Sequence, residues 1–276
     1  MLTVTLIRHG ESTHNVQALW SGCTECPLTE RGAQQARAVG AYFANTQFTK
    51  IYGSPLPRAR DTAQAVLEAQ PLPKPPHDFS IALIKERSFG AAEGHRTCIR
   101  EPGKTLEAHF EEEKYPILYE SEREIAFPGG ESAADLTRRG ERAVREVVLP
   151  HVVSVARTGK DEHVALVSHG LCIAEIVGAI VRLGGGTWKR KGPMVNTAWV
   201  RVEVRAQGGG PMEVANGEVP PVEVTVTNEG RADHLEGLLD GGPLDGMKAI
   251  QGGGVVDVRN PNEAEAIAQT SGGKSV

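Results

Sequence analysis

The sequence lacks several features that would assign it to a particular class of protein. It has no apolar run of about 18 residues, so no transmembrane helix is expected. Four cysteines in 276 residues are too few for a disulfide framework, which favours a reducing, cytoplasmic location. The first residues show no basic lead, separate apolar stretch or cleavage site of a secretory signal. From these absences we expect neither a membrane protein nor a disulfide-rich secreted protein.

The chain also lacks an excess of positive charge. Its formal net charge is −5, whereas proteins that bind nucleic acid or membrane surfaces in general need a basic face. We therefore expect neither partner. A local group of arginines can still outweigh the overall balance, so a small anionic substrate remains compatible with the composition. No pattern in the sequence predicts the oligomeric state.

Strand and helix signals alternate along the chain. Apolar, strand-like runs occur at residues 2–7, 50–53 and 163–168. Helix starts are indicated at Thr29, at Pro57, at Leu171 and at Ser132, which opens a helix of about 25 residues with a capping box. Residues 199–205 and 222–226 predict a late antiparallel pair of strands. The expected fold is α/β, with three layers and a mostly parallel sheet flanked by helices, ending in an antiparallel edge strand.

The composition changes near the C-terminus. From residue 236 to residue 276 the chain is rich in glycine and polar residues. We therefore predict one domain over 1–235 and a largely irregular tail over 236–276, with a possible short helix near 262–268.

Two of the predicted strands end alike. The first is followed by Arg8-His9-Gly10 and the later one by Ser168-His169-Gly170. If both strands lie in one parallel sheet, both histidines emerge at the same edge, where α/β proteins place their sites. Arg58 also follows a short strand and starts a helix, where the helix dipole disfavours a cation unless an anion lies nearby. Two arginines and two histidines at one point predict a pocket for a phosphoryl group.

At these motifs the sequence resembles the histidine phosphatase superfamily, the phosphoglycerate mutase-like group. The resemblance follows the family's order over about residues 3–205. It rests on Arg8-His9-Gly10-Glu11-Ser12 with Asn15, the segments 27–32 and 54–63, Glu86-Arg87-Ser88-Phe89-Gly90 with Glu93-Gly94, the segment 127–132, and Ser168-His169-Gly170.

The resemblance implies a role for each matching residue. His9 would be the nucleophile that becomes a phosphohistidine. Arg8, Arg58 and His169 would surround the transferred phosphoryl group, with Asn15 as a neutral donor. Glu86 matches the family's general acid. Gly170 would let the backbone approach the ligand closely. No metal or other cofactor is expected, because arginines and histidines would carry the charge that a metal supplies elsewhere.

The substrate is less well defined by the sequence. The segment from 83 to 132 looks more like the fructose-2,6-bisphosphatase-related phosphatases than the mutases, and Ser88 and Phe89 depart from the usual histidine and tyrosine. We expect a phosphatase acting on a small phosphorylated metabolite, such as a sugar mono- or bisphosphate. Mutase-type phosphoryl transfer and a catalytically silent interaction module remain alternatives. Basic residues from 85 to 104, including Arg87 and Arg100, would hold a second phosphate or form a solvated surface.

Two further patterns favour structural roles. Cys23 and Cys26 form a Cys-x-x-Cys motif, but no second pair of ligands indicates a zinc site, so free thiols are expected. The charged residues of the helix that starts at Ser132 are interpreted as a solvated face, namely Arg138, Arg139, Glu141, Arg142 and Arg145.

Overall fold

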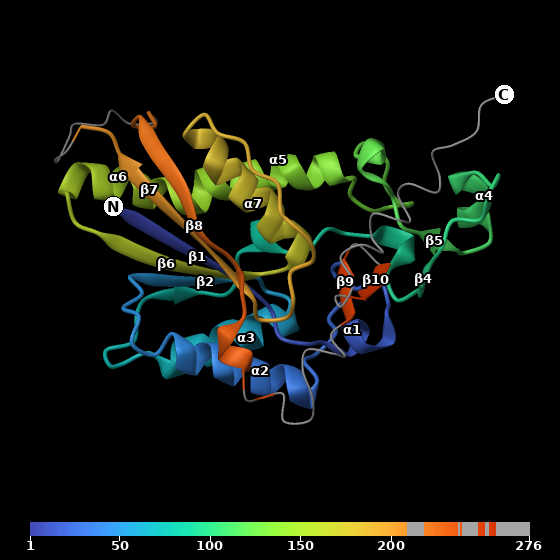
Figure 1. Cartoon of the computed structure of the whole chain (residues 1–276), viewed down its shortest axis with the longest axis horizontal. Helices are drawn as coiled ribbons and strands as arrows, with labels where there is room; N and C mark the ends of the chain where they lie inside the picture. The colour runs from blue at the N-terminus through green and yellow to red at the C-terminus, as the bar shows by residue number, and fades with distance from the viewer. Residues whose placement is uncertain (209–217, 237, 239–247, 252–253, 258–276) are drawn as a thin grey trace.

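The computed structural model describes residues 1–208, 218–236, 238, 248–251 and 254–257 (Figure 1). Its centre is a six-stranded sheet with the order β3-β2-β6-β1-β7-β8. The strands are β1 (Leu2–Arg8), β2 (Lys50–Gly53), β3 (His77–Asp78), β6 (Glu162–Ser168), β7 (Trp199–Ala206) and β8 (Val222–Arg231). Two small sheets pair β4 (Thr97–Cys98) with β5 (Tyr115–Pro116), and β9 (Lys248–Gln251) with β10 (Gly254–Asp257).

The direction of the strands agrees with the sequence prediction. The first four strands of the order pair in parallel, from β3 through β2 and β6 to β1. β7 runs antiparallel to β1, and β8 antiparallel to β7, so the late antiparallel pair closes one edge of the sheet. The register of β1 and β6 runs from Leu2 opposite Glu162 to Arg8 opposite Ser168. The two predicted histidines therefore leave the sheet side by side.

Helices cover both faces of the sheet, as Figure 1 shows. On one face pack α2 (Glu30–Tyr42) and α3 (Pro57–Ala69), and on the other α5 (Ala133–Ala143), α6 (Leu149–Thr158) and α7 (Gly170–Leu183). Two shorter helices are α1 (Thr13–Gln17) and α4 (Leu106–Glu111). Apolar side chains of β1 reach both layers, because Leu6 packs with α5–α7 and Ile7 with α2 and α3. The three-layer α/β prediction is confirmed.

The helix predicted from Ser132 is present but interrupted. Ser132 and Asp135 form the capping box, in which the Asp135 backbone N–H donates to the Ser132 hydroxyl at 3.0 Å and the Asp135 carboxylate accepts from the Ser132 N–H at 2.9 Å. A π-turn over Val144–Val148 then separates α5 from α6. Pro150 lies in the first turn of α6, where its missing N–H and its ring prevent a regular α-helical continuation.

The segment between β3 and α5 forms a separate small cluster beside the sheet. It consists of short 3₁₀ turns at Ala82–Ile84, Gly90–Ala92 and Glu120–Glu122, together with α4, β4 and β5. Its core is largely aromatic and combines Phe89, Tyr115 and Phe127 of this segment with Trp20 from the loop after α1. In the tail, the predicted helix near 262–268 lies outside the described residues, and the described residues include β9 and β10, which pair antiparallel. In the described part of the chain, no helix is long and apolar enough to cross a membrane.

The loop after β1 approaches α2 so closely that only glycine fits at the contact. A Cβ atom added to Gly32 would lie 1.9 Å from the backbone oxygen of Glu11, and one added to Gly10 would lie 2.4 Å from the oxygen of Gly32. Thr29 caps α2 at the same place by accepting from the Gly32 N–H at 2.9 Å. This contact holds the loop that follows His9 against the sheet.

We therefore predict that Gly32→Ala destabilises the protein by about 1–3 kcal/mol, because backbone atoms must move to admit the methyl group. Urea unfolding followed by circular dichroism measures the change. Gln34→Ala, at an exposed position of the same helix, is the control and should stay within about 0.5 kcal/mol of wild type. Equal stability of the Gly32 variant and the control would contradict this account of the contact.

Candidate active site

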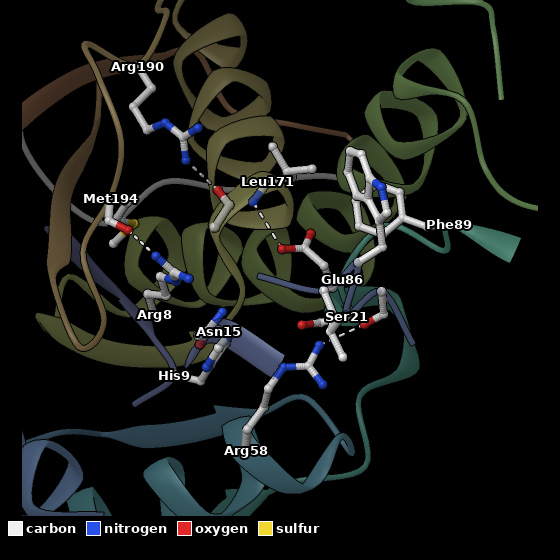
Figure 2. A pocket seen from close by; sticks show the side chains of 14 residues that line it. Arg8, His9, Asn15, Ser21, Arg58, Glu86, Phe89, Leu171, Arg190 and Met194 are labelled. Atoms are coloured by element: carbon white, nitrogen blue, oxygen red, sulfur yellow. Dashed lines mark hydrogen bonds between the residues drawn. The ribbon is translucent and has the colours of Figure 1, made fainter. Parts of the chain in front are cut away.

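Both predicted histidines lie at the carboxyl end of the parallel strands. The backbone N–H of His9, the first residue after β1, donates to the backbone oxygen of Ser168, the last residue of β6, at 2.9 Å. The ring centroids of His9 and His169 are 5.1 Å apart. Both residues are buried, with exposed fractions of 4% and 0%. His9 lines a small pocket of about 50 Å³, which Figure 2 shows from close by.

The surroundings of His9 prepare it as a nucleophile. Its Nδ1 lies 2.6 Å from the Gly10 carbonyl oxygen, which can only accept, so Nδ1 carries the proton. The lone pair is therefore on Nε2. Burial, followed by the charges of Arg58 and Arg8, lowers the pKa of His9 well below its usual value. The imidazole is neutral at physiological pH, as a nucleophile requires.

His169 is buried directly beside His9. Its Nε2 lies 2.8 Å from the Ser54 hydroxyl, and its Nδ1 has no partner in the described structure. Burial, then the charge of Arg58, lowers the pKa of His169 well below its usual value. Ser54 is the first residue after β2, so this contact ties the end of β6 to the link between β2 and α3.

Two buried arginines face the same pocket without a carboxylate partner. Arg58 is fully buried and donates through Nη1 to the Thr24 oxygen at 2.9 Å and through Nη2 to the Gly22 oxygen at 2.7 Å. Arg8 donates to the Met194 oxygen, and burial lowers its pKa to about 10. The Nε groups of Arg8 and Arg58 have no partner, and neither side chain is in an ion pair with a described residue. A bound anion would satisfy both.

Asn15 is oriented by its neighbours. Its Oδ1 accepts from the Ser12 N–H at 3.0 Å and from the Asn196 side chain at 3.2 Å. The amide nitrogen is therefore the group left for a ligand, and Asn15 lines the pocket. The same Asn196 amide donates to the His9 backbone oxygen at 3.1 Å.

Glu86 lies across the pocket from Arg58 (Figure 2). Its carboxylate accepts from the Leu171 N–H at 3.3 Å and the Cys172 N–H at 3.2 Å, in the first turn of α7. Gly170 begins that helix and lines the pocket. Glu86 thus engages two of the free amides at this helix N-terminus.

The prediction that Arg139 lies on a solvated helix face is wrong. The Arg139 side chain is only 17% exposed and donates to the backbone oxygens of Leu83, Lys85 and Glu86 at 2.8–2.9 Å. It also pairs with Glu131 at 2.8 Å. Arg139 thereby fixes the backbone that carries Glu86. The other charged residues named on that face are exposed, as predicted.

Arg87 and Arg100 do not reach the pocket around His9. Arg87 is buried and donates to the backbone oxygens of Glu131 and Ile125 at 2.7 and 3.1 Å. Arg100 makes a two-bond ion pair with Glu122 at 2.9 and 3.0 Å. Both side chains thus bond to other parts of the protein, although the buried Nε of Arg100 has no partner in the described structure. Arg87 lines a larger adjoining cavity, and Arg100 lines neither space.

The sequence interpretation did not identify Arg190, which lines the pocket from the loop between α7 and β7. Its only signal was its place among three consecutive basic residues at 189–191. All four cysteines are free thiols, as expected. The loop that carries Cys23 and Cys26 also supplies the acceptors for Arg58, and the Cys26 Sγ lies 3.3 Å from Arg58 Nη1.

Comparison with known proteins assigns the family. Residues 4–216 match the model of the histidine phosphatase superfamily (branch 1), and the chain belongs to that family. A 2,3-bisphosphoglycerate-dependent phosphoglycerate mutase of Gloeobacter violaceus is 32% identical, over 64% of this chain and 74% of its own. A glucosyl-3-phosphoglycerate phosphatase of Mycolicibacterium vanbaalenii is 28% identical, over 74% of this chain and 86% of its own.

Further relatives agree with this assignment. The fructose-2,6-bisphosphatase TIGAR of Xenopus tropicalis is 37% identical, but the alignment covers only 33% of this chain and 34% of that protein. The solved structure of a mycobacterial glucosyl-3-phosphoglycerate phosphatase superposes with a TM-score of 0.58 at 24% identity, over 82% of this chain and 99% of its own. That likeness supports the fold. With the family match, the chain is a phosphatase of the histidine phosphatase type.

The buried histidines predict how stability depends on pH. The folded state keeps His9 and His169 neutral, whereas the unfolded chain protonates each near pH 6.5, so the unfolded state binds more protons as pH falls. The free energy of unfolding should therefore decrease as pH is lowered from about 7.5 to 5.5, by at most about 1.4 kcal/mol per pH unit for each histidine. His163 and His234, whose pKa values burial lowers to about 4, add to the same trend.

Urea unfolding at a series of pH values tests this dependence. His9→Asn and His169→Asn should each reduce the slope of unfolding free energy against pH. Asn15→Ala removes a pocket side chain that does not titrate, so it should change stability without changing the slope. Slopes of the histidine variants equal to that of wild type would show that these residues are not held neutral by the fold.

Proposed function

We propose that the protein hydrolyses phosphomonoesters of small phosphorylated metabolites through a phosphohistidine at His9. One observation carries the proposal. A neutral histidine has its Nδ1 proton committed to a backbone carbonyl and its Nε2 lone pair free, beside two buried arginines without carboxylate partners. Such a site attracts a phosphoryl group and offers it a nucleophile.

In the first step, Nε2 of His9 attacks phosphorus, forming the P–N bond while the P–O bond to the leaving group breaks. Arg8, Arg58 and the amide of Asn15 stabilise the charge on the transferred oxygens. Glu86, in its protonated form, gives its proton to the leaving oxygen. Glu86 lies on the other side of the pocket from His9 in Figure 2, which supports this role, because the leaving group must depart on the side away from His9.

In the second step, water attacks the phosphohistidine. Glu86, now a carboxylate, takes the water proton, the P–N bond breaks, and inorganic phosphate leaves. His9 returns to its neutral form with Nδ1–H still bonded to Gly10. Arg139 supports both steps indirectly, because it holds the backbone that carries Glu86.

The leaving group has ample room. Next to the phosphate pocket lies a cavity of about 880 Å³ between α5, α7 and the residues from 117 to 127. A space of this size favours a metabolite larger than phosphoglycerate, and relatives named for glucosyl-3-phosphoglycerate and fructose 2,6-bisphosphate point to phosphorylated sugars. Mutase-type transfer is the second candidate, since one relative is a phosphoglycerate mutase. An adjoining cavity that can hold water is less suited to a mutase, which must protect its phosphoenzyme.

The first test is phosphate release from a panel of esters by wild type and His9→Ala. The panel contains p-nitrophenyl phosphate, 3-phosphoglycerate, sugar mono- and bisphosphates, and a phosphotyrosine peptide. Wild type should release phosphate from sugar phosphates, and His9→Ala should lose at least about 1000-fold in kcat, because it removes the nucleophile. His77→Ala, at an exposed position of β3, is the matched control and should keep wild-type rates.

Glu86→Gln separates the acid role from a structural one. Nitrophenolate leaves without a proton, whereas a sugar alkoxide needs one, so the variant should lose about 100-fold or more on sugar phosphates and much less on p-nitrophenyl phosphate. Equal losses on both would contradict the acid role. No phosphate release by wild type from any ester would contradict hydrolysis itself and favour a mutase or a catalytically silent protein.

A further inference from the structure

The phosphate pocket and the larger cavity meet at a few shared residues. Both spaces are lined by Trp20, Phe89, Leu171 and Arg190. Three of these are apolar, so Arg190 is the charged group at the junction among the residues that the structure describes. A leaving group that extends from the phosphate into the larger cavity has to pass this side chain.

The other cations around the larger cavity are already neutralised or held. The ion pairs are Arg123 with Glu175 at 2.8 Å, Arg138 with Asp135 at 2.6 Å, Arg182 with Glu141 at 2.9 Å and Lys189 with Glu120 at 3.8 Å. Arg87 donates to two backbone carbonyls. Arg190, by contrast, donates only to the Gly170 oxygen, at 2.8 Å, and its buried Nε has no partner within the described chain.

Arg190 also lies close to another unpaired arginine. A Cβ atom added to Gly170 would lie 3.7 Å from Arg190 Nη1 and 3.8 Å from Arg8 Nε, so the two guanidinium groups flank the same glycine. Burial is the largest cause that lowers the pKa of Arg8. The charge of Glu86 raises this pKa, and the charge of Arg190 lowers it. Two cations held this close repel each other until an anion binds near them. The arrangement favours a ligand with more than one anionic group.

Arg190 lines the same pocket as His9, but the arginine charges that act most on the nucleophile come from two other residues. The charges that lower the pKa of His9 are those of Arg58 and Arg8. Arg190 instead lines the opening from the phosphate pocket into the larger cavity, together with Leu171 and Phe89. In the proposed reaction this is the side on which the leaving oxygen departs. An anion bound by Arg190 is therefore part of the leaving group and separate from the transferred phosphoryl group.

We propose that Arg190 is a specificity-determining residue that binds a second anionic group, a carboxylate or a phosphate, on the leaving group of the substrate. The inference rests on the proposed hydrolysis and narrows its substrate class to phosphomonoesters that carry another anion near the ester. A guanidinium group suits this task, because its planar donors match either a carboxylate or a phosphate. Arg190 takes the place that the sequence analysis considered for Arg87 and Arg100, which are engaged elsewhere.

Matched substrates test the proposal in the full-length protein. The first pair is 3-phosphoglycerate and glycerol 3-phosphate, which differ by one carboxylate. The second is fructose 1,6-bisphosphate and fructose 6-phosphate, which differ by one phosphate. Wild type should prefer the more anionic member of at least one pair, and the preferred pair identifies the anion.

Arg190→Gln should reduce kcat/KM for that preferred substrate by about 10- to 100-fold, mainly through KM, as expected for a lost bond between charged groups. The less anionic partner should lose less than about threefold. Arg190→Lys should restore most of the preference, because it keeps the charge. Lys191→Gln removes a charge from the same loop at an exposed position outside both spaces, and should preserve the preference.

Three results would overturn the inference while leaving hydrolysis intact. Wild type could show no preference in either pair, Arg190→Gln could retain the preference, or it could lose activity equally on all esters including p-nitrophenyl phosphate. The last result would place Arg190 on the transferred phosphoryl group. Failure of wild type to hydrolyse any ester would refute the proposed function, and the inference with it.

Discussion

The site depends on the register of β1 and β6. These strands pair in parallel so that Arg8 lies opposite Ser168, and the backbone N–H of His9, directly after β1, donates to the Ser168 oxygen at the end of β6. A shift by one residue would turn the side chains of a strand to the opposite face. The apolar residues of β1 pack into helical layers on both faces, which fixes that register. The packing of the core therefore also fixes where the two histidines lie.

The charges of the site follow from burial. Arg58 and Arg8 lie out of solvent, where backbone carbonyls accept from some of their donors and no carboxylate among the described residues forms an ion pair with them. Their charge and the surrounding burial keep His9 neutral. A site that is cationic and yet contains an uncharged nucleophile is complementary to a phosphoryl group. The same reasoning extends to Arg190, whose unpaired charge lies where the leaving group would pass.

Sequence patterns predicted the features that depend on local signals. The capping residues Thr29 and Ser132 start their helices as predicted, and the apolar strands form a mostly parallel sheet, because these signals are short-range. His9, Arg8 and Arg58 could be placed together because strand ends in a parallel sheet share an edge. The position of Arg190 and the partners of Arg139 could not be predicted, because they depend on how a loop and a helix pack against segments that are distant in the sequence. Charge alone did not distinguish Arg139, which is bonded to three carbonyls, from its exposed neighbours.

The central claim is that His9 carries the phosphoryl group between the two steps. The most direct measurement is rapid-quench labelling with a ³²P-phosphorylated substrate, followed by peptide mapping. The account predicts a label on His9 that is labile in acid and stable in alkali, that disappears in His9→Ala, and that decays as inorganic phosphate is released. Phosphate release without any such label on His9, or a label on a different residue, would contradict it.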